Sequence, residues 1–141
     1  MAYKINVSHK GRTFKAEVDN EDFIQMKIGE KAEGSMVSPE LEGYSLEITG
    51  TSDIAGFPGI KGETGQQLRK LLLTKDDLGM NETRPQGLRL KKSVRGEEIS
   101  DKTMQINMKV LKEGTKKFDE VCPAKPPKER AAPKAATAPA A

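Results

Sequence analysis

The sequence predicts a mainly β protein: a small, mostly antiparallel sheet or barrel with at most one or two short helices and a disordered C-terminal tail. Three observations predict this class. Several short segments alternate apolar and polar residues with a period of two, as half-buried strands do. Glycine-rich stretches between these segments supply turns. The C-terminal stretch contains no large apolar side chain.

The first predicted element is a β-hairpin at the N-terminus. Tyr3, Ile5 and Val7 alternate with polar residues, and residues 12–18 repeat the pattern. Between the two segments, residues 8–11 read SHKG, which is typical of a hairpin turn.

The middle of the chain is less regular. Glycine and proline interrupt residues 19–43, which allow short strands at best, and residues 44–50 alternate again. Residues 66–74 are ambiguous, because their leucines fit both a helical spacing and a short buried strand. We expect a strand or a single helical turn there.

Two further strands are predicted at residues 88–95 and 104–110. In the first, Leu88, Leu90 and Val94 face one side, with Lys92 as an exception. The residues that share its opposite face are Arg89, Lys91, Ser93 and Arg95. The apolar residues predicted for one face of the second strand are Met104, Ile106, Met108 and Val110.

A change in composition divides the chain into a β-rich domain, residues 1–121, and a basic tail, residues 122–141. The tail is rich in proline and alanine and has too little apolar surface to repay the entropy of ordering. We therefore expect one domain followed by a disordered segment.

Composition argues against a membrane protein and against a metal site. No apolar run approaches the roughly 18 residues of a membrane span, and the N-terminus lacks the apolar region of a signal peptide, so a cytosolic chain is expected. The single Cys122 and single His9 give no set of zinc ligands. Neither a metal nor a cofactor is expected.

The glycine-rich stretch GFPGIKGETG, residues 56–65, has a glycine at every third position. It is too short for a collagen triple helix and lacks the Gly-Lys-Ser/Thr ending of a phosphate-binding P-loop. The paired carboxylates of the chain lie in polar, turn-rich stretches, where solvated loop charges explain them better than catalysis. The sequence therefore predicts neither an enzyme nor a small-molecule substrate.

Charge is distributed unevenly, although the net charge is only +3. Residues 84–95, RPQGLRLKKSVR, hold five cations and no acid. On a strand, alternate side chains lie about 7 Å apart, a spacing comparable to that of neighbouring phosphates, so this pattern favours an anionic polymer. Because only 4% of residues are aromatic, we expect backbone or shape recognition of folded RNA. The alternative is a β-barrel interaction module whose basic face binds an acidic protein.

Two motifs resemble signatures of the archaeal and eukaryotic small-subunit ribosomal protein family S6e. The first motif, TGTSDIAGFPGIKG, matches the family at Gly50, Asp53, Gly56, Phe57 and Pro58, with Gly59 where the family usually has methionine. The second motif, RPQGLRLKKSVRG, matches it at Lys92, Ser93, Val94, Arg95 and Gly96. The resemblance covers residues 1–115 and is closer to the archaeal type, because the tail contains no serine.

This resemblance implies a compact, β-rich structural protein of the cytoplasmic small ribosomal subunit, without catalytic activity, that binds ribosomal RNA and neighbours other ribosomal proteins. The RNA contacts that it implies are Lys61, Arg69, Lys70, Arg84, Arg89, Lys91, Lys92 and Arg95. The glycines expected to let RNA approach the backbone are Gly56, Gly59 and Gly62. A packed turn fixed by Phe57 and Pro58, with no ligand, is an equal alternative for this loop. Residues 81–83, Gln86 and Leu88 stand where the family is often basic, which implies a smaller RNA footprint.

Overall fold

The computed structural model describes residues 2–80, 83 and 85–121. Its strands are β1 (Tyr3–His9), β2 (Arg12–Val18), β3 (Lys31–Glu33), β4 (Ser45–Asp53), β5 (Leu68–Leu73), β6 (Leu90–Arg95) and β7 (Thr103–Lys112). Its short helical segments are the 3₁₀ turns η1 (Glu21–Phe23), η2 (Gly34–Met36) and η3 (Pro39–Leu41) and the single helical turn α1 (Phe118–Val121). The prediction of a mainly β fold with little helix is confirmed.

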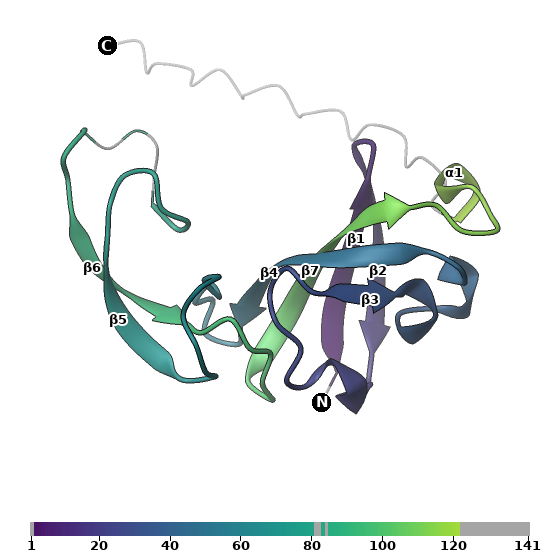
Figure 1. The fold of residues 1–141 in the computed structure, drawn as a ribbon, viewed down its shortest axis with the longest axis horizontal. Helices are drawn as coiled ribbons and strands as arrows, with labels where there is room; N and C mark the ends of the chain where they lie inside the picture. The colour runs from purple at the N-terminus through teal and green to yellow at the C-terminus, as the bar shows by residue number, and fades with distance from the viewer. Residues whose placement is uncertain (1, 81–82, 84, 122–141) are drawn as a thin grey trace, which may run out of the picture.

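Five strands form one sheet in the order β2-β1-β7-β4-β3 (Figure 1). The predicted N-terminal hairpin is present, with Val7 opposite Phe14. β7 occupies the centre of the sheet and pairs antiparallel with β4. Its pairing with β1 is parallel, with Ile5 beside Ile106, so the sheet is antiparallel except at this one ladder.

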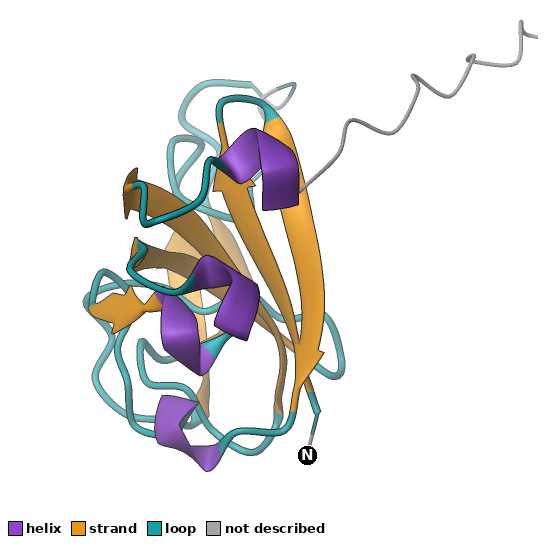
Figure 2. Cartoon of the chain, turned by 90° about the vertical axis from the view of Figure 1, so that its right-hand side faces the viewer, coloured by secondary structure: helices purple, strands orange, loops and turns teal. Residues whose placement is uncertain are grey.

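The hydrophobic core lies against one face of this sheet. Alternation along β1 and β4 buries Ile5 and Ile48 with other apolar residues on that face, while polar residues face the other way. The core is completed by residues from the connecting segments and from α1: Phe23, Val37, Leu41, Ile99 and Phe118. Figure 2 shows the 3₁₀ turns and α1 beside the strands. Where each apolar face is buried, the strand register is well specified.

Met104 departs from the predicted face of β7. Ile106 and Met108 are buried as expected, but Met104 is 37% exposed. The register shifts at this point, because Ser52 pairs with Gln105 and the next residue of β4 pairs with Thr103. Met104 is therefore the extra residue of a β-bulge, and Thr103 takes the buried position.

β5 and β6 form a separate two-stranded antiparallel ribbon, which extends away from the large sheet (Figure 1). Within the ambiguous segment 66–74, Leu68–Leu73 form a strand, with Leu73 opposite Leu90. Pairing with β6 decides this, since Leu73 and Val94 then share one buried face. The predicted tail, residues 122–141, lies outside the described residues.

Candidate nucleic-acid interface

A buried ion pair joins the ribbon to the large sheet. Arg95, at the end of β6, donates from Nε and Nη2 to Oδ2 of Asp53, at the end of β4, over 3.0 and 2.6 Å. Its Nη1 donates to the backbone carbonyl of Gln66 over 2.8 Å. The exposed fractions of Arg95 and Asp53 are 9% and 8%. Although the sequence places Arg95 on the basic face of its strand, its guanidinium is occupied by contacts within the protein.

The loop after β4 folds back on that strand and then against β6. Gly56, with φ of 86°, donates its backbone N–H to the carbonyl of Asp53 over 2.9 Å, and the N–H of Asp53 donates to the carbonyl of Phe57 over 3.0 Å. The N–H of Arg95 then donates to the carbonyl of Pro58 over 2.9 Å. This tight turn needs a positive φ at Gly56, which glycine adopts without strain.

The three glycines predicted to admit RNA have different surroundings. Gly59 is buried, and a Cβ there would lie 2.1 Å from Oγ1 of Thr51. The backbone of Gly59 therefore packs closely against Thr51. Gly56 and Gly62 are exposed, and a Cβ on either would meet no described atom within 4 Å. Only the latter two therefore leave space for a close approach, although the N–H of Gly62 donates to Oε2 of Glu97 over 3.1 Å and that of Gly56 donates to Asp53.

Three exposed cations lie on one face of the ribbon. Residues directly opposite each other in an antiparallel pair share a face, and the register sets Lys70 against Ser93 and Lys91 against Leu72. Arg89 precedes β6 by one residue and continues the same alternation as Lys91. We call Lys70, Arg89 and Lys91 the basic face. None of the three forms an ion pair with another described residue.

Arg69 and Lys92 lie on the other face of the ribbon and have partners there. Nη1 of Arg69 is 3.6 Å from Oε2 of Glu63. Nζ of Lys92 donates to the backbone carbonyl of Gly79 over 2.8 Å and so ties the segment after β5 to β6. These two cations are thus engaged within the protein, whereas the basic face is open.

The remaining two predicted contacts lie in connecting segments. Lys61 is exposed and follows Ile60, whose backbone N–H donates to the carbonyl of Arg95 over 3.0 Å. This bond holds the start of the loop close to the ribbon. Arg84 lies outside the described residues.

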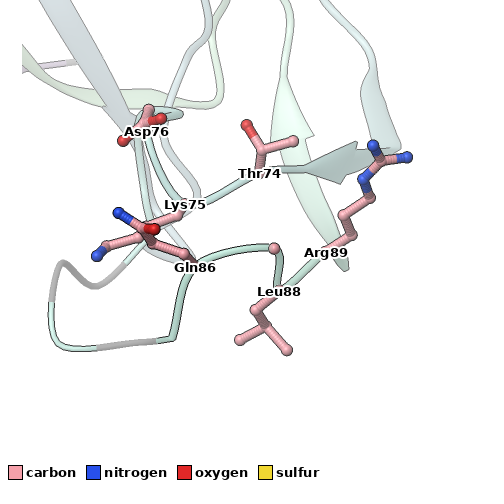
Figure 3. A pocket seen from close by; sticks show the side chains of 7 residues that line it. Thr74, Lys75, Asp76, Gln86, Leu88 and Arg89 are labelled. Atoms are coloured by element: carbon pink, nitrogen blue, oxygen red, sulfur yellow. The ribbon is translucent and has the colours of Figure 1, made fainter.

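A small hollow of about 280 Å³ lies at the far end of the ribbon, between the end of β5 and the segment leading into β6. Lys75 and Gln86 both line it, and in Figure 3 the guanidinium of Arg89 extends away from them. Nearby, Asp77 accepts bonds from the backbone N–H and Oγ1 of Thr74, over 2.7 and 2.9 Å. These bonds lower the pKa of the Asp77 carboxyl below its ordinary value.

A larger hollow of about 620 Å³ lies between the loop after β4 and the ribbon. Its apolar lining comes from Phe57, Pro58, Leu73 and Val94. Sequence reasoning did not identify this hollow, because it forms only when the loop and two strands come together. The signal that could have indicated it is a phenylalanine in a turn, outside every alternating segment.

Among the residues that the structure describes, no group of histidine, cysteine and acidic side chains could hold a metal ion. Nor does any described helix have the length and apolarity needed to cross a membrane.

Comparison with known proteins gives a family match over most of the chain. The model of the family described as ribosomal protein S6e matches residues 1–123. The chain belongs to this family. The S6e resemblance of its two motifs is thereby confirmed, and a ribosomal protein family agrees with the expectation of a chain that is not an enzyme.

Three relatives within the S6e family, each named small ribosomal subunit protein eS6, show the extent of the similarity. A Methanococcus maripaludis protein is 38% identical over 117 residues, 82% of this chain and 91% of the relative. A Methanosphaera stadtmanae protein is 37% identical over 124 residues, 86% and 92% of the two chains. An Encephalitozoon cuniculi protein is 36% identical over 120 residues, 84% of this chain but 54% of the relative, so the chain spans about half the length of that protein.

The two S6e motifs meet in the fold. Residues 50–58 and 92–96 are far apart in the sequence, yet Asp53 of the first forms the buried ion pair with Arg95 of the second. Pro58 and Gly59 of the loop also bond or bridge to β6. The positions that carry the family resemblance therefore hold the ribbon against the sheet.

Proposed function

We propose that this chain is a structural protein of the cytoplasmic small ribosomal subunit that binds ribosomal RNA through the basic face. The observation that carries the proposal is the set of three exposed cations on one face of a projecting ribbon, Lys70, Arg89 and Lys91, which form no ion pair within the described part of the chain. Neighbouring phosphates repeat at a distance that such side chains can match, and arginine can grip a phosphate through two hydrogen bonds. The relatives' name, small ribosomal subunit protein eS6, supports both the RNA and neighbouring ribosomal proteins as partners.

The other predicted contacts take subordinate roles in this proposal. Lys61 in the neighbouring loop, and Arg69 and Lys92 on the other face of the ribbon, add positive potential, while the buried Arg95 fixes the orientation of the ribbon. Gly56 and Gly62 are the positions where an RNA backbone can approach the chain.

The test compares the salt dependence of RNA binding between two matched variants. The triple variant Lys70→Gln, Arg89→Gln, Lys91→Gln removes the basic face. The control, Lys4→Gln, Lys15→Gln, Lys31→Gln, removes the same charge from the outer face of the large sheet, where these three lysines are exposed. The probe is small-subunit ribosomal RNA from Methanococcus maripaludis, and the full chain is used throughout.

The expected result follows from counterion release. If the protein contacts about five phosphates, its affinity falls about 500-fold between 50 and 200 mM salt, and a variant that has lost three contacts falls only about 12-fold. The control keeps the steep dependence. Equal slopes for the two variants would contradict the proposed surface. Absence of salt-dependent RNA binding, with nuclease-resistant capture of an acidic protein, would instead support an interaction module.

A further inference from the structure

The 620 Å³ hollow beside the basic face has a lining suited to a flat, apolar ligand. Leu73 and Val94, 5% and 1% exposed, form its base on the ribbon side, and Phe57 and Pro58 form the opposite side. Its volume lies within the range of small-ligand pockets, about 300–1,000 Å³.

Phe57 differs from the other three phenylalanines of the chain. Phe23 and Phe118 are buried in the core and Phe14 packs against it, whereas Phe57 belongs to none of these core contacts. It is half-buried and lines the hollow, and it has no aromatic neighbour among the described residues. A partly exposed aromatic ring in a turn is a ready stacking surface.

The rim of the hollow is basic and open. Lys92, on the same ribbon face as Val94, lines it, and Nζ of Lys92 donates to the carbonyl of Gly79 over 2.8 Å. Lys91 also lines it, although alternation turns the Lys91 side chain to the other face of the ribbon. Gly56 and Gly79, with φ of 86° and 87°, line it without side chains. None of the described residues that line it is acidic. An apolar floor with a cationic rim is complementary to a nucleobase that carries a backbone phosphate.

We infer that this hollow receives one unpaired base of the RNA, stacked on Phe57, with an adjoining phosphate at Lys92, whose side chain shares the face of Leu73 and Val94. The inference rests on the proposed function and adds a base-binding site to it. An unpaired base suits the site, because bases of loops and bulges can be splayed out and stacked on aromatic side chains without opening a helix. The basic face then follows the backbone on the neighbouring surface of the ribbon. The scarcity of aromatic residues in the sequence favours recognition of the RNA backbone. The hollow adds one base contact to that recognition.

The test uses the full chain, the same ribosomal RNA and two substitutions at one position. Phe57→Leu keeps an apolar side chain but removes the ring, and Phe57→Tyr keeps the ring. Loss of one stacked base is expected to weaken binding about 5- to 150-fold for Phe57→Leu, whereas Phe57→Tyr binds as the wild type does. Since neither substitution removes a cation, the slope of affinity against salt changes by at most the one phosphate contact that adjoins the stacked base. Ultraviolet cross-linking of the wild-type complex should attach an RNA base to the peptide that contains Phe57.

Each outcome separates the two proposals. Wild-type-like affinity of Phe57→Leu, with salt-sensitive RNA binding intact, would overturn the base site and leave the proposed function standing. If the wild-type chain shows no salt-sensitive binding to the RNA, the proposed function itself is overturned. Circular dichroism checks that each variant folds, and if Phe57→Leu does not, the cross-link decides: an RNA base on residues 53–60 supports the site, and cross-links only elsewhere contradict it.

Discussion

At the scale of single residues, Arg95 shows how a cation in a basic run can have an internal role. Side chains of β6 alternate between its two faces as predicted. This alternation predicts the face on which Arg95 lies, but not which other segments cover that face. The loop after β4 and the carbonyl of Gln66 provide that cover. Asp53, which balances its charge, is 42 residues away in the sequence.

The substitution Asp53→Asn tests this arrangement by leaving the buried guanidinium without a counter-charge. Removing one partner of a buried ion pair is expected to cost about 3–5 kcal/mol of the free energy of unfolding, measured by urea denaturation. The control, Glu63→Gln, breaks the more exposed contact with Arg69 and should cost less than about 1 kcal/mol. Equal stability of Asp53→Asn and the wild type would show that the pair does not fasten the ribbon.

The limits of sequence reasoning are also clearest at single residues. Alternation correctly predicted the buried faces of β1 and β4, because period-two burial is a local property of a half-buried strand. It could not predict the bulge at Met104, which arises from a register shift against β4. Nor could it predict the Phe57 hollow or the internal packing of Gly59, since both depend on segments that meet only in the folded chain.

At the scale of elements, pairing decides what local pattern leaves open. Residues 66–74 have leucines at both helical and strand spacings, and the partner strand β6 selects the strand. Leu73 and Val94 then pack inward, and Lys70 and Lys91 point outward beside the exposed Leu68 and Leu72. By contrast, the basic character of β6 was readable from sequence alone.

The turn of the N-terminal hairpin is tied to the end of β7 by Glu113. Oε1 of Glu113 is 3.0 Å from Nζ of Lys10 and 2.7 Å from Nε2 of His9. The bonds from Lys10 and then His9 lower the pKa of the Glu113 carboxyl below its ordinary value. The contribution of this contact to stability is therefore present above the pKa of the unfolded chain and is lost as the pH falls through the folded-state pKa.

Replacing Lys10 by glutamine should raise the pKa of Glu113 toward its ordinary value, because the largest cause of the shift is removed. The measurement is an NMR titration of the Glu113 side-chain carboxyl carbon. Lys4→Gln, at the opposite end of β1, should leave that pKa unchanged. An unchanged pKa in Lys10→Gln would mean that Lys10 does not hold the carboxylate in solution.

At the scale of the whole molecule, the fold is one sheet with a projecting ribbon, and the described core ends near α1. The buried apolar residues run from Tyr3 to Phe118. Phe118 packs edge-on against Tyr44 and His9, with ring centroids 6.4 and 5.5 Å apart. The hydroxyl of Tyr44 donates to the carbonyl of Lys116. The described segment that follows β7, up to α1, therefore packs against the core.

Two truncations should separate the domain from the tail. Deleting residues 122–141 should leave the midpoint of urea denaturation unchanged, since this segment offers no large apolar side chain for burial. Deleting residues 116–141 also removes Phe118, and loss of a buried phenylalanine is expected to cost about 3–5 kcal/mol. A lower midpoint for the shorter deletion would show that the tail stabilises the domain.

The parallel pairing of β1 with β7 has a consequence for the order of events during synthesis. Ile5 is made early, but its neighbour Ile106 follows about a hundred residues later. At about 5–20 residues per second, this interval lasts roughly 5–20 s, during which the N-terminal hairpin has no central strand to pair with. A two-stranded hairpin is at best marginally stable in water. The ribbon with its cations is synthesised before β7, so the nascent chain carries its basic segment before the large sheet can close.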